Sequence, residues 1–361
     1  MPVNEEFWNP YRMISVREDT KNKKAPLTDE KFVGHSGHLT CSLTNLTPLF
    51  IGGNRDDLSD KNRTFLTRTV DQTKKYVIPG TSLKGVLRSL AEIIGKGCMI
   101  TQSTCKKINM LCIACRMFGM MEKGTNARVH KGKVSISDAI LQEEPSCIPF
   151  QVYMDSCKDR HEPFYRTQET GRYDQKSRKL YFHQPKRKES VSSLSKEEQQ
   201  RSWIINALKI NHHFEFSVQF SNLTEKELSL LVYILALENN VSAVIETGNI
   251  KLKGPLCHKI GNAKPLGLGS CHIQIKKLVL LGAAENRFSS LKNTHDKSYT
   301  GDALESKINL YIKDFVSDHS PGMQQLRKMM IWDKTDERLF KYPGYHWFRN
   351  PENSQKSLKH I

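Results

Sequence analysis

The sequence lacks any apolar run long enough to cross a membrane. Its longest candidates, such as Leu228–Leu237, fall well short of the ~20 apolar residues that a membrane-spanning helix needs. The N-terminal stretch Met1–Pro10 is acidic and aromatic, whereas a secretory signal begins with positive charge and continues into an apolar segment. We therefore expect a cytoplasmic protein.

Two common phosphate-binding motifs are also missing. The glycine-rich segment Lys259–Ser270 contains no Gly-Lys-Ser/Thr, so it is not a P-loop. It precedes an expected strand instead of following one, so it is not a dinucleotide fingerprint either. Internal repeats are absent as well.

Negative charge is scarce. The chain has 55 Lys and Arg against 38 Asp and Glu, a formal net charge of +17. Such a surplus attracts polyanions, of which nucleic acid and anionic membrane surfaces are the usual ones. An ordinary basic soluble protein is the alternative interpretation.

The apolar periodicity predicts a short series of strands and helices. Strands are expected near Leu39–Leu43 and over 133–141, 213–220 and 273–281, and helices from Leu83 to Ile94 and after the capping box of Thr224 and Glu227. The order strand, helix, strand, strand, helix, strand is the ferredoxin-like pattern, which the RRM shares. We therefore predict an α+β fold with a ferredoxin-like (RRM-like) βαββαβ core.

Several segments are larger than such a core requires. We expect an N-terminal arm or packing segment over 1–36, the core over 37–285 and a mostly helical extension over 286–361, with Trp332, Trp347 and Phe348 as docking residues. Within the core lie a polar loop from Asn54 to Lys75, a cysteine-rich segment over 98–118 and an insertion over 142–211. Long insertions in a compact domain are usually functional or disordered.

The cysteine-rich segment indicates a metal site. Four of the nine cysteines fall within 18 residues, and the last two form a tight Cys-x2-Cys pair: Cys98, Cys105, Cys112 and Cys115. Cysteines in a reducing compartment are poor disulfide candidates, and clustered ones more often bind metal. Four thiolates fill a tetrahedral zinc site, so we predict structural zinc; four unrelated buried cysteines are the alternative.

Two further segments are suited to phosphate. The expected helix start at Pro79–Arg88 offers unpaired N–H groups, with Lys84 and Arg88 on one face, although an ordinary capped helix would look the same. The segment Lys259–Ser270 has three glycines whose amides could line an anion site, or it is simply a tight turn.

A third basic stretch runs from Arg172 to Lys188. It contains seven Lys and Arg with aromatic residues between them, among them Arg172, Arg178, Lys179, Tyr181 and His183. Basic side chains hold phosphates while aromatic rings stack on bases. A solvated hairpin or a disordered loop is the alternative.

Together these segments resemble a known family. Ile78-Pro-Gly-Thr-Ser-Leu-Lys-Gly-Val-Leu-Arg88 and Lys259-Ile-Gly-Asn-Ala-Lys-Pro-Leu-Gly-Leu-Gly-Ser270 are similar to signatures of the RAMP superfamily of CRISPR-associated proteins. Cys115-Arg-Met-Phe-Gly119 and Ser177-Arg-Lys-Leu-Tyr-Phe-His183 add to the match. The resemblance is greatest to backbone subunits of type III-D-like effectors and to the related type VII subunit.

The resemblance implies an RNA-binding subunit of an antiviral ribonucleoprotein complex. Copies would form a filament along guide RNA (crRNA), meet complementary target RNA and contact other effector subunits, among them a separate nuclease. The matched guide contacts are Ser82, Lys84, Arg88, Lys264, Gly267, Gly269 and Ser270. The insertion 142–211 would be the thumb that flips a base, and the zinc knuckle is also a family feature.

One departure bears on catalysis. Target-cutting members carry an aspartate about a dozen residues before the Pro-Gly turn, and here that position falls near Asn62–Thr64. We therefore expect a scaffold without nuclease activity. The alternative is an endoribonuclease that uses Mg²⁺ or Mn²⁺ with Asp60 or Asp57; a third hypothesis is guide processing with His35 and His38 as general acid and base.

Overall fold

A large antiparallel sheet organises the molecule. The computed structural model describes residues 8–28, 30–53, 62–99, 105–154, 161–166, 176–186, 196–283, 295–359 and 361. Nine strands join in the order β16-β17-β2-β13-β9-β5-β4, with β8 paired to β13 and β18 paired to β17. Their bounds are β2 His35–Asn45, β4 Thr67–Val70, β5 Thr73–Ile78, β8 Val134–Ile136, β9 Ala139–Leu141, β13 His213–Leu223, β16 His258–Lys259, β17 Ser270–Leu280 and β18 Lys297–Tyr299.

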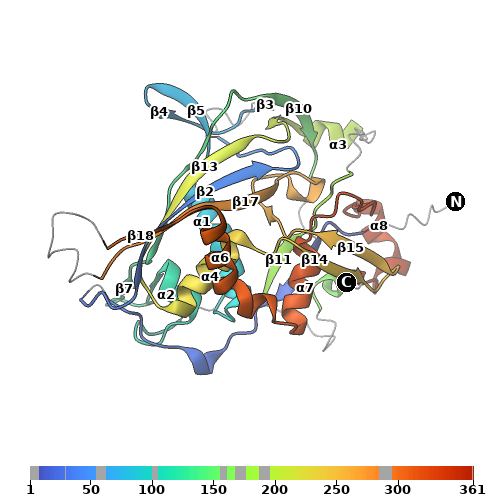
Figure 1. Cartoon of the computed structure of the whole chain (residues 1–361). Coiled ribbons are helices and arrows are strands. Elements are labelled where there is room, and N and C mark those ends of the chain that lie inside the picture. Colours follow the sequence, from blue (N-terminus) through green and yellow to red (C-terminus); the bar gives the residue numbers. More distant parts are fainter. Residues whose placement is uncertain are drawn as a thin grey trace.

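Three helices cover one face of this sheet: α1 (Gly80–Ile94), α4 (Glu225–Ala236) and α6 (Gly301–Val316) (Figure 1). Alternate side chains of the three central strands are buried, and the register places them opposite one another: Leu39, Cys41 and Leu43 of β2, Phe214, Phe216 and Val218 of β13, and Ile273, Ile275 and Leu278 of β17. Helix α4 also packs against α6 and α1, which explains why apolar residues surround it on nearly all sides.

The expected elements of the core are present. The predicted strand over 133–141 divides into β8 and β9, because Asp138 at the break accepts a hydrogen bond from the N–H of Gly80 at 2.9 Å. The capping box of Thr224 and Glu227 is confirmed at the start of α4. The mixed α/β class is therefore confirmed, with four strands in the order β17-β2-β13-β9 at its centre.

The predicted polar loop from Asn54 to Lys75 was wrong in its second half. Strands β4 and β5 form a hairpin there, with Asp71 and Gln72 at the turn, both at positive φ. Most of its side chains are exposed, so the apolar alternation that marks a half-buried strand is absent. The turn also lacks the Asn-Gly or Asp-Gly pair typical of two-residue hairpins.

The insertion over 142–211 contributes to two separate sheets. Strand β10 (Cys147–Val152) pairs with β12 (Trp203–Leu208), which β3 (Asn62–Arg63) joins in parallel. Strand β11 (Ser177–Tyr181) instead pairs with β1 (Tyr11–Ser15). Since Tyr11 and Ile14 are buried, the described part of the N-terminal segment packs on the molecule and is no loose arm.

Shorter elements complete the chain. The cysteine-rich segment contains α2 (Ile113–Phe118) and leads into the hairpin β6–β7 (Met120–Met121 and Val129–His130). A second hairpin, β14–β15 (Val241–Ile245 and Ile250–Gly254), packs against α7. The remaining elements are α3 Lys196–Arg201, α7 Pro321–Met330, α8 Tyr345–Arg349 and the 3-10 turns η1 Thr20–Asn22, η2 Glu162–Phe164, η3 Lys264–Leu266 and η4 Pro351–Asn353.

The C-terminal extension docks through its aromatic residues, as predicted. Trp347 and Phe348 pack in a cluster with Tyr11 and Phe164. Trp332 is buried, with its ring centroid 5.7 Å from that of His183. The extension therefore holds the N-terminal strand and the insertion together.

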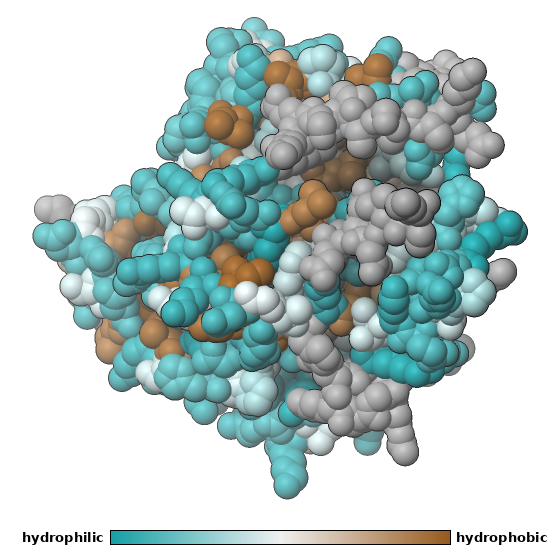
Figure 2. All heavy atoms as spheres, turned by 90° about the vertical axis from the view of Figure 1, so that its right-hand side faces the viewer, coloured by the Kyte–Doolittle hydropathy of each residue, from teal (hydrophilic) through white to brown (hydrophobic). Residues whose placement is uncertain are grey.

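The face that carries α8 and β14–β15 is mostly hydrophilic, with separate smaller apolar patches (Figure 2). Exposed large apolar side chains in this part of the chain include Val244, Leu339 and Tyr345. Within the described residues, every helix is too short or too polar to span a membrane.

Candidate nucleic-acid interface

A groove of about 430 Å³ runs between the start of α1 and the glycine-rich loop, two segments about 180 residues apart in sequence. Its walls come from the segment that follows β2, from α1 with the residue before it, and from the glycine-rich loop: Ile51, Gly52, Pro79, Ser82, Gly85, Val86, Ser89, Ile260, Gly261, Asn262 and Lys264. Two of the predicted phosphate-binding segments therefore form one site.

Helix α1 presents small residues to this groove. Ser82, Gly85 and Ser89 follow one another at spacings of three and four residues, so they share one face of the helix. A Cβ built on Gly85 would contact nothing within 4 Å, which leaves room for another backbone to approach. Gly80, by contrast, is packed so closely that a Cβ would lie 2.2 Å from the carbonyl oxygen of Ile136.

Lys84 lies on the same side of α1 as Arg88, away from the residues that line the groove. It is half-buried, and a Cβ built on Gly132 would lie 3.2 Å from its Nζ. Burial, and then the charge of Arg88, lower the pKa of Lys84. A nearby anion would relieve both effects, because it favours the charged form of the amine.

Arg88 and Arg178, both predicted RNA contacts, instead converge on the buried carboxylate of Glu92. Arg88 Nε lies 3.1 Å from Glu92 Oε1, and Arg178 Nε lies 2.9 Å from Oε2. Arg88 also donates to the carbonyl of Gly119 at 2.8 Å and to Cys115 Sγ at 3.4 Å. These two arginines therefore join α1, β11 and the cysteine-rich segment.

The far half of the glycine-rich loop is buried behind the groove. Gly267 and Gly269 donate their amides to the carbonyls of Lys264 and Pro48, so these N–H groups already have protein acceptors. A Cβ on Gly269, whose φ is +79°, would lie 1.8 Å from the carbonyl oxygen of Ile260. These glycines therefore serve the close turn, and Lys264 is the matched residue that lines the groove.

A buried hydrogen-bonded chain anchors the same loop. Lys259 Nζ donates to Ser270 Oγ at 3.0 Å, and Ser270 Oγ lies 2.8 Å from His183 Nδ1. His183 Nε2 lies 3.1 Å from the carbonyl oxygen of Cys257. Burial, with the charge of Lys259, lowers the pKa of His183 to about 3, so this imidazole is neutral. Its role is to hold the loop through buried hydrogen bonds.

The third predicted segment meets the groove through Tyr181. Lys264 Nζ lies 5.9 Å from the centroid of its ring, and Lys179 Nζ lies 5.5 Å from it on β11. Lys179 is also 3.8 Å from the ring centroid of Tyr11. An aromatic ring with two cations close to it therefore lies next to Lys264 of the groove. Arg172, also in this predicted segment, lies outside the described residues.

Sequence reasoning missed several groove residues. Asn262 is exposed at the groove and lies inside the matched motif, but carries no charge that would mark it. Ser89 and Gly52 were missed as well. The repetition of small residues along α1 was the available signal for Ser89.

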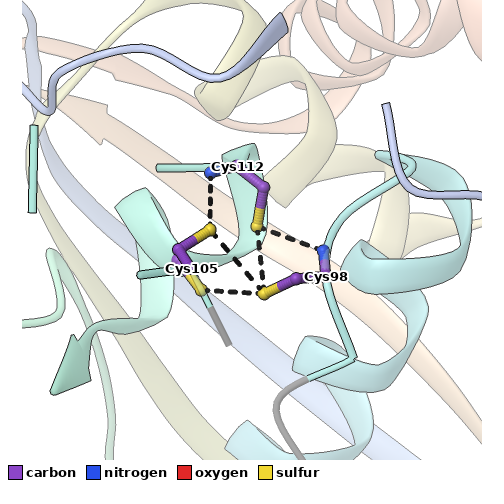
Figure 3. Close-up of side chains that lie close together, drawn as sticks. Cys98, Cys105 and Cys112 are labelled. Carbon is purple, nitrogen blue, oxygen red and sulfur yellow. Dashed lines mark hydrogen bonds between the residues drawn. The ribbon is translucent and has the colours of Figure 1, made fainter. Parts of the chain in front are cut away.

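The four cysteines of the predicted metal site come together. Their Sγ atoms all lie within 4.8 Å of one another, and all four residues are buried. Figure 3 shows Cys98, Cys105 and Cys112 with their sulfurs turned toward one another. From Cys98 Sγ the distances are 3.4 Å to Cys115, 3.8 Å to Cys105 and 3.6 Å to Cys112.

These distances suit a metal ion. A tetrahedron with metal–sulfur bonds of ~2.3 Å has edges of about 3.8 Å. Backbone N–H groups also point at the sulfurs, from Cys98 to Cys112 Sγ and from Cys112 to Cys105 Sγ, and they stabilise negative thiolates. The group can therefore hold a metal such as zinc, and its four protein ligands would leave no open position for substrate.

The structure describes only part of the candidate catalytic set. Asp57 and Asp60 lie outside the described residues. His35 and His38 are three residues apart on β2, so their side chains point to opposite faces of the sheet. The hypothesis that they act together as general acid and base is therefore wrong.

The comparison with known families rests on more than half of the chain. Residues 42–250 match the family model described as the RAMP superfamily, and this range includes α1, the cysteine group and most of the core. The chain belongs to the RAMP superfamily. The matched range ends before the glycine-rich loop, so the RAMP match covers one wall of the groove.

Other comparisons are more distant. A solved chain described as "Type IV-B CRISPR Complex" is 13% identical, with 66% of this chain and 90% of that chain covered and a TM-score of 0.35. No curated protein sequence matches this RAMP chain.

Proposed function

We propose that the chain is a guide-RNA-binding backbone subunit of a CRISPR ribonucleoprotein of the type III or type VII kind. It would grip the RNA backbone, repeat along the guide and present it to complementary target RNA. The observation that carries this proposal is the groove that joins the start of α1 to the glycine-rich loop, since both walls resemble guide-contacting motifs. The strand order β17-β2-β13-β9, with α1 and α4 among its covering helices, supports a ferredoxin-like core.

The chemistry of the groove favours a phosphate backbone over base edges. Ser82, Ser89 and Asn262 supply hydrogen-bonding groups, and Lys264 supplies a cation. Lys84, on another side of α1, would meet the RNA outside the groove. Burial lowers the pKa of Lys264, so a phosphate there would favour its charged form. Tyr181, whose ring lies 5.9 Å from Lys264 Nζ, would stack on a base.

Zinc in the cysteine group would then be structural. It would hold the cysteine-rich segment against α1, through the contact of Arg88 with Cys115, and so keep one wall of the groove in place. Arg116, next to Cys115, pairs at 2.6 Å with buried Glu227 of the α4 capping box. The metal site would thereby brace α1 and α4.

The test is a salt titration of RNA binding. Lys84→Gln with Lys264→Gln removes two phosphate contacts, so the double variant should bind every RNA sequence more weakly and lose about 1.4 from the slope of log K against log salt. Lys313→Gln, on the exposed side of α6, is the matched control and should leave the slope unchanged. An unchanged slope in the double variant would show that RNA binds elsewhere.

A further inference from the structure

A second pocket lies at the opposite end of the sheet from the groove. It has a volume of about 460 Å³ and is lined by His35, Glu225, Leu280, Leu281, Gly282, Ala283, His295, Lys297, Tyr299, Lys307 and Tyr311. His35 begins β2, whereas the groove lies beyond its end at Asn45. At ~3.3 Å per residue, β2 separates the two sites by about 33 Å.

The walls of this pocket bring basic and aromatic side chains together. Lys297 and Tyr299 are two residues apart on β18, so they point to the same side of the strand. Lys307 of α6 lies with its Nζ 4.7 Å from the ring centroid of Tyr311 and 6.0 Å from that of Tyr299. Burial raises the pKa of Tyr311 to about 12, so this phenol is neutral.

One carboxylate faces these cations, and it already has a partner. Glu225 Oε2 lies 2.7 Å from His35 Nε2. The cysteine group is the one place in the described chain where metal-ligating atoms converge, so the histidines of this pocket are not arranged around a metal. A surplus of positive charge therefore remains for an anionic ligand.

Gly282 closes one side of the pocket. A Cβ there would lie 2.6 Å from Cβ of His295, so only glycine allows the two segments this approach. Its N–H donates to Asp296 at 2.9 Å, which orients that carboxylate toward the backbone. The end of β17 and the start of β18 are thus held together.

We propose that this pocket binds the phosphate of a single nucleotide, with Lys297 and Lys307 on the phosphate and Tyr299 against the base. The volume lies within the roughly 300–1,000 Å³ of small-molecule sites, and a separate pocket suits one nucleotide better than a strand that passes through. The phosphate belongs either to a free nucleotide or to the terminal nucleotide of an RNA strand. The site is distinct from the RNA groove and does not depend on it.

The test uses the full-length protein and isothermal titration with ATP. Lys297→Gln with Lys307→Gln should raise the dissociation constant at least tenfold, and Tyr299→Ala should raise it more than Tyr299→Phe. Lys313→Gln, on the same helix but outside the pocket, should leave it unchanged. Equal weakening by Lys313→Gln would overturn the assignment, because general surface charge would then account for binding.

The two phosphate sources are separated with a uridine trinucleotide that carries either a 5′-phosphate or a 5′-hydroxyl. The titration is made in the Lys84→Gln, Lys264→Gln background, so that the groove does not contribute. Preference for ATP supports a free nucleotide, and preference for the phosphorylated over the unphosphorylated trinucleotide supports a strand end. If neither probe shows saturable binding, the proposal is overturned, whereas the proposed function of the groove is unaffected.

Discussion

At Glu92 one buried carboxylate accepts hydrogen bonds from two arginines that lie 90 residues apart, Arg88 and Arg178. Buried charges are stable only when they are paired, so both arginines are required where they are. In the sequence, both arginines stand near other basic residues, so they were predicted to contact RNA. Their inward direction depends on Glu92, which helical periodicity places on the side of α1 opposite the apolar stripe and which is nevertheless buried.

Arg88→Gln should therefore lower the stability of the fold, and any loss of RNA affinity should follow from that. We expect the free energy of unfolding to fall by about 2 kcal/mol, since a hydrogen-bonded charge loses its partner. Metal affinity should fall with it, because the bond to Cys115 is lost. Urea unfolding and a zinc assay measure both, with Lys84→Gln as the control that changes RNA affinity alone. Weakened RNA binding at unchanged stability would instead place Arg88 on the ligand.

His183 predicts a pH dependence. Its pKa in the folded protein is about 3, against ~6.5 in an unfolded chain. Below pH ~6.5 the unfolded chain binds a proton that the folded chain does not, so this stabilisation is lost as the pH falls toward 3. Between pH 7 and pH 5 the loss at this one site is about 2 kcal/mol.

His183→Gln tests this expectation, since a Gln amide can still donate to the carbonyl of Cys257. The unfolding free energy of the variant should fall less between pH 7 and pH 5 than that of the parent. His258, whose pKa burial lowers to about 4, still contributes in both proteins. Parallel pH profiles would rule out His183 as the source.

Among the elements, the cysteine-rich segment is the one that connects to both α1 and α4. Cys112 opens α2, Cys115 receives Arg88 of α1, and Arg116 pairs with Glu227 of α4. Glu227 also binds Lys133 at 2.7 Å, just before β8. Loss of the metal should therefore loosen α1 and α4.

Cys112→Ser should release the metal, lower the melting temperature and weaken RNA binding together. A three-ligand site is weaker, and the loss reaches the groove through α1. Cys147→Ser is the control, since this partly exposed cysteine contacts Tyr76 and lies outside the cluster. Full zinc content in Cys112→Ser would contradict the assigned ligand set.

The core elements were predictable because their signals are local. The stripe of Leu83, Leu87 and Leu90 and the alternation of β13 each lie within one segment. The partners of β11 and β3 could not be inferred in the same way, since β11 pairs with a strand more than 160 residues earlier and β3 with one about 140 residues later. For the site, the sequence indicated which residues suit phosphate but not which of them face inward, as Ser270 and His183 do.

For the whole molecule, the question is whether it cuts RNA. We expect no cleavage of target RNA when the protein, guide and Mg²⁺ or Mn²⁺ are combined, because the acid typical of cutting members is displaced from its position. Denaturing gels of labelled target would show cuts at even spacing if this expectation were wrong. Abolition of such cuts by Asp60→Ala would then identify the chain as a nuclease.

The position of β17 has a practical consequence. The family match ends at residue 250, whereas β17, which lies beside β2 at the centre of the sheet, begins at Ser270. A recombinant fragment trimmed to the matched range would lack β17 and all of β2 except residues 42–45, so β13 would be left with a long open edge and an uncovered apolar face. Such edges recruit strands from other molecules, so the fragment should precipitate where the full chain stays in solution.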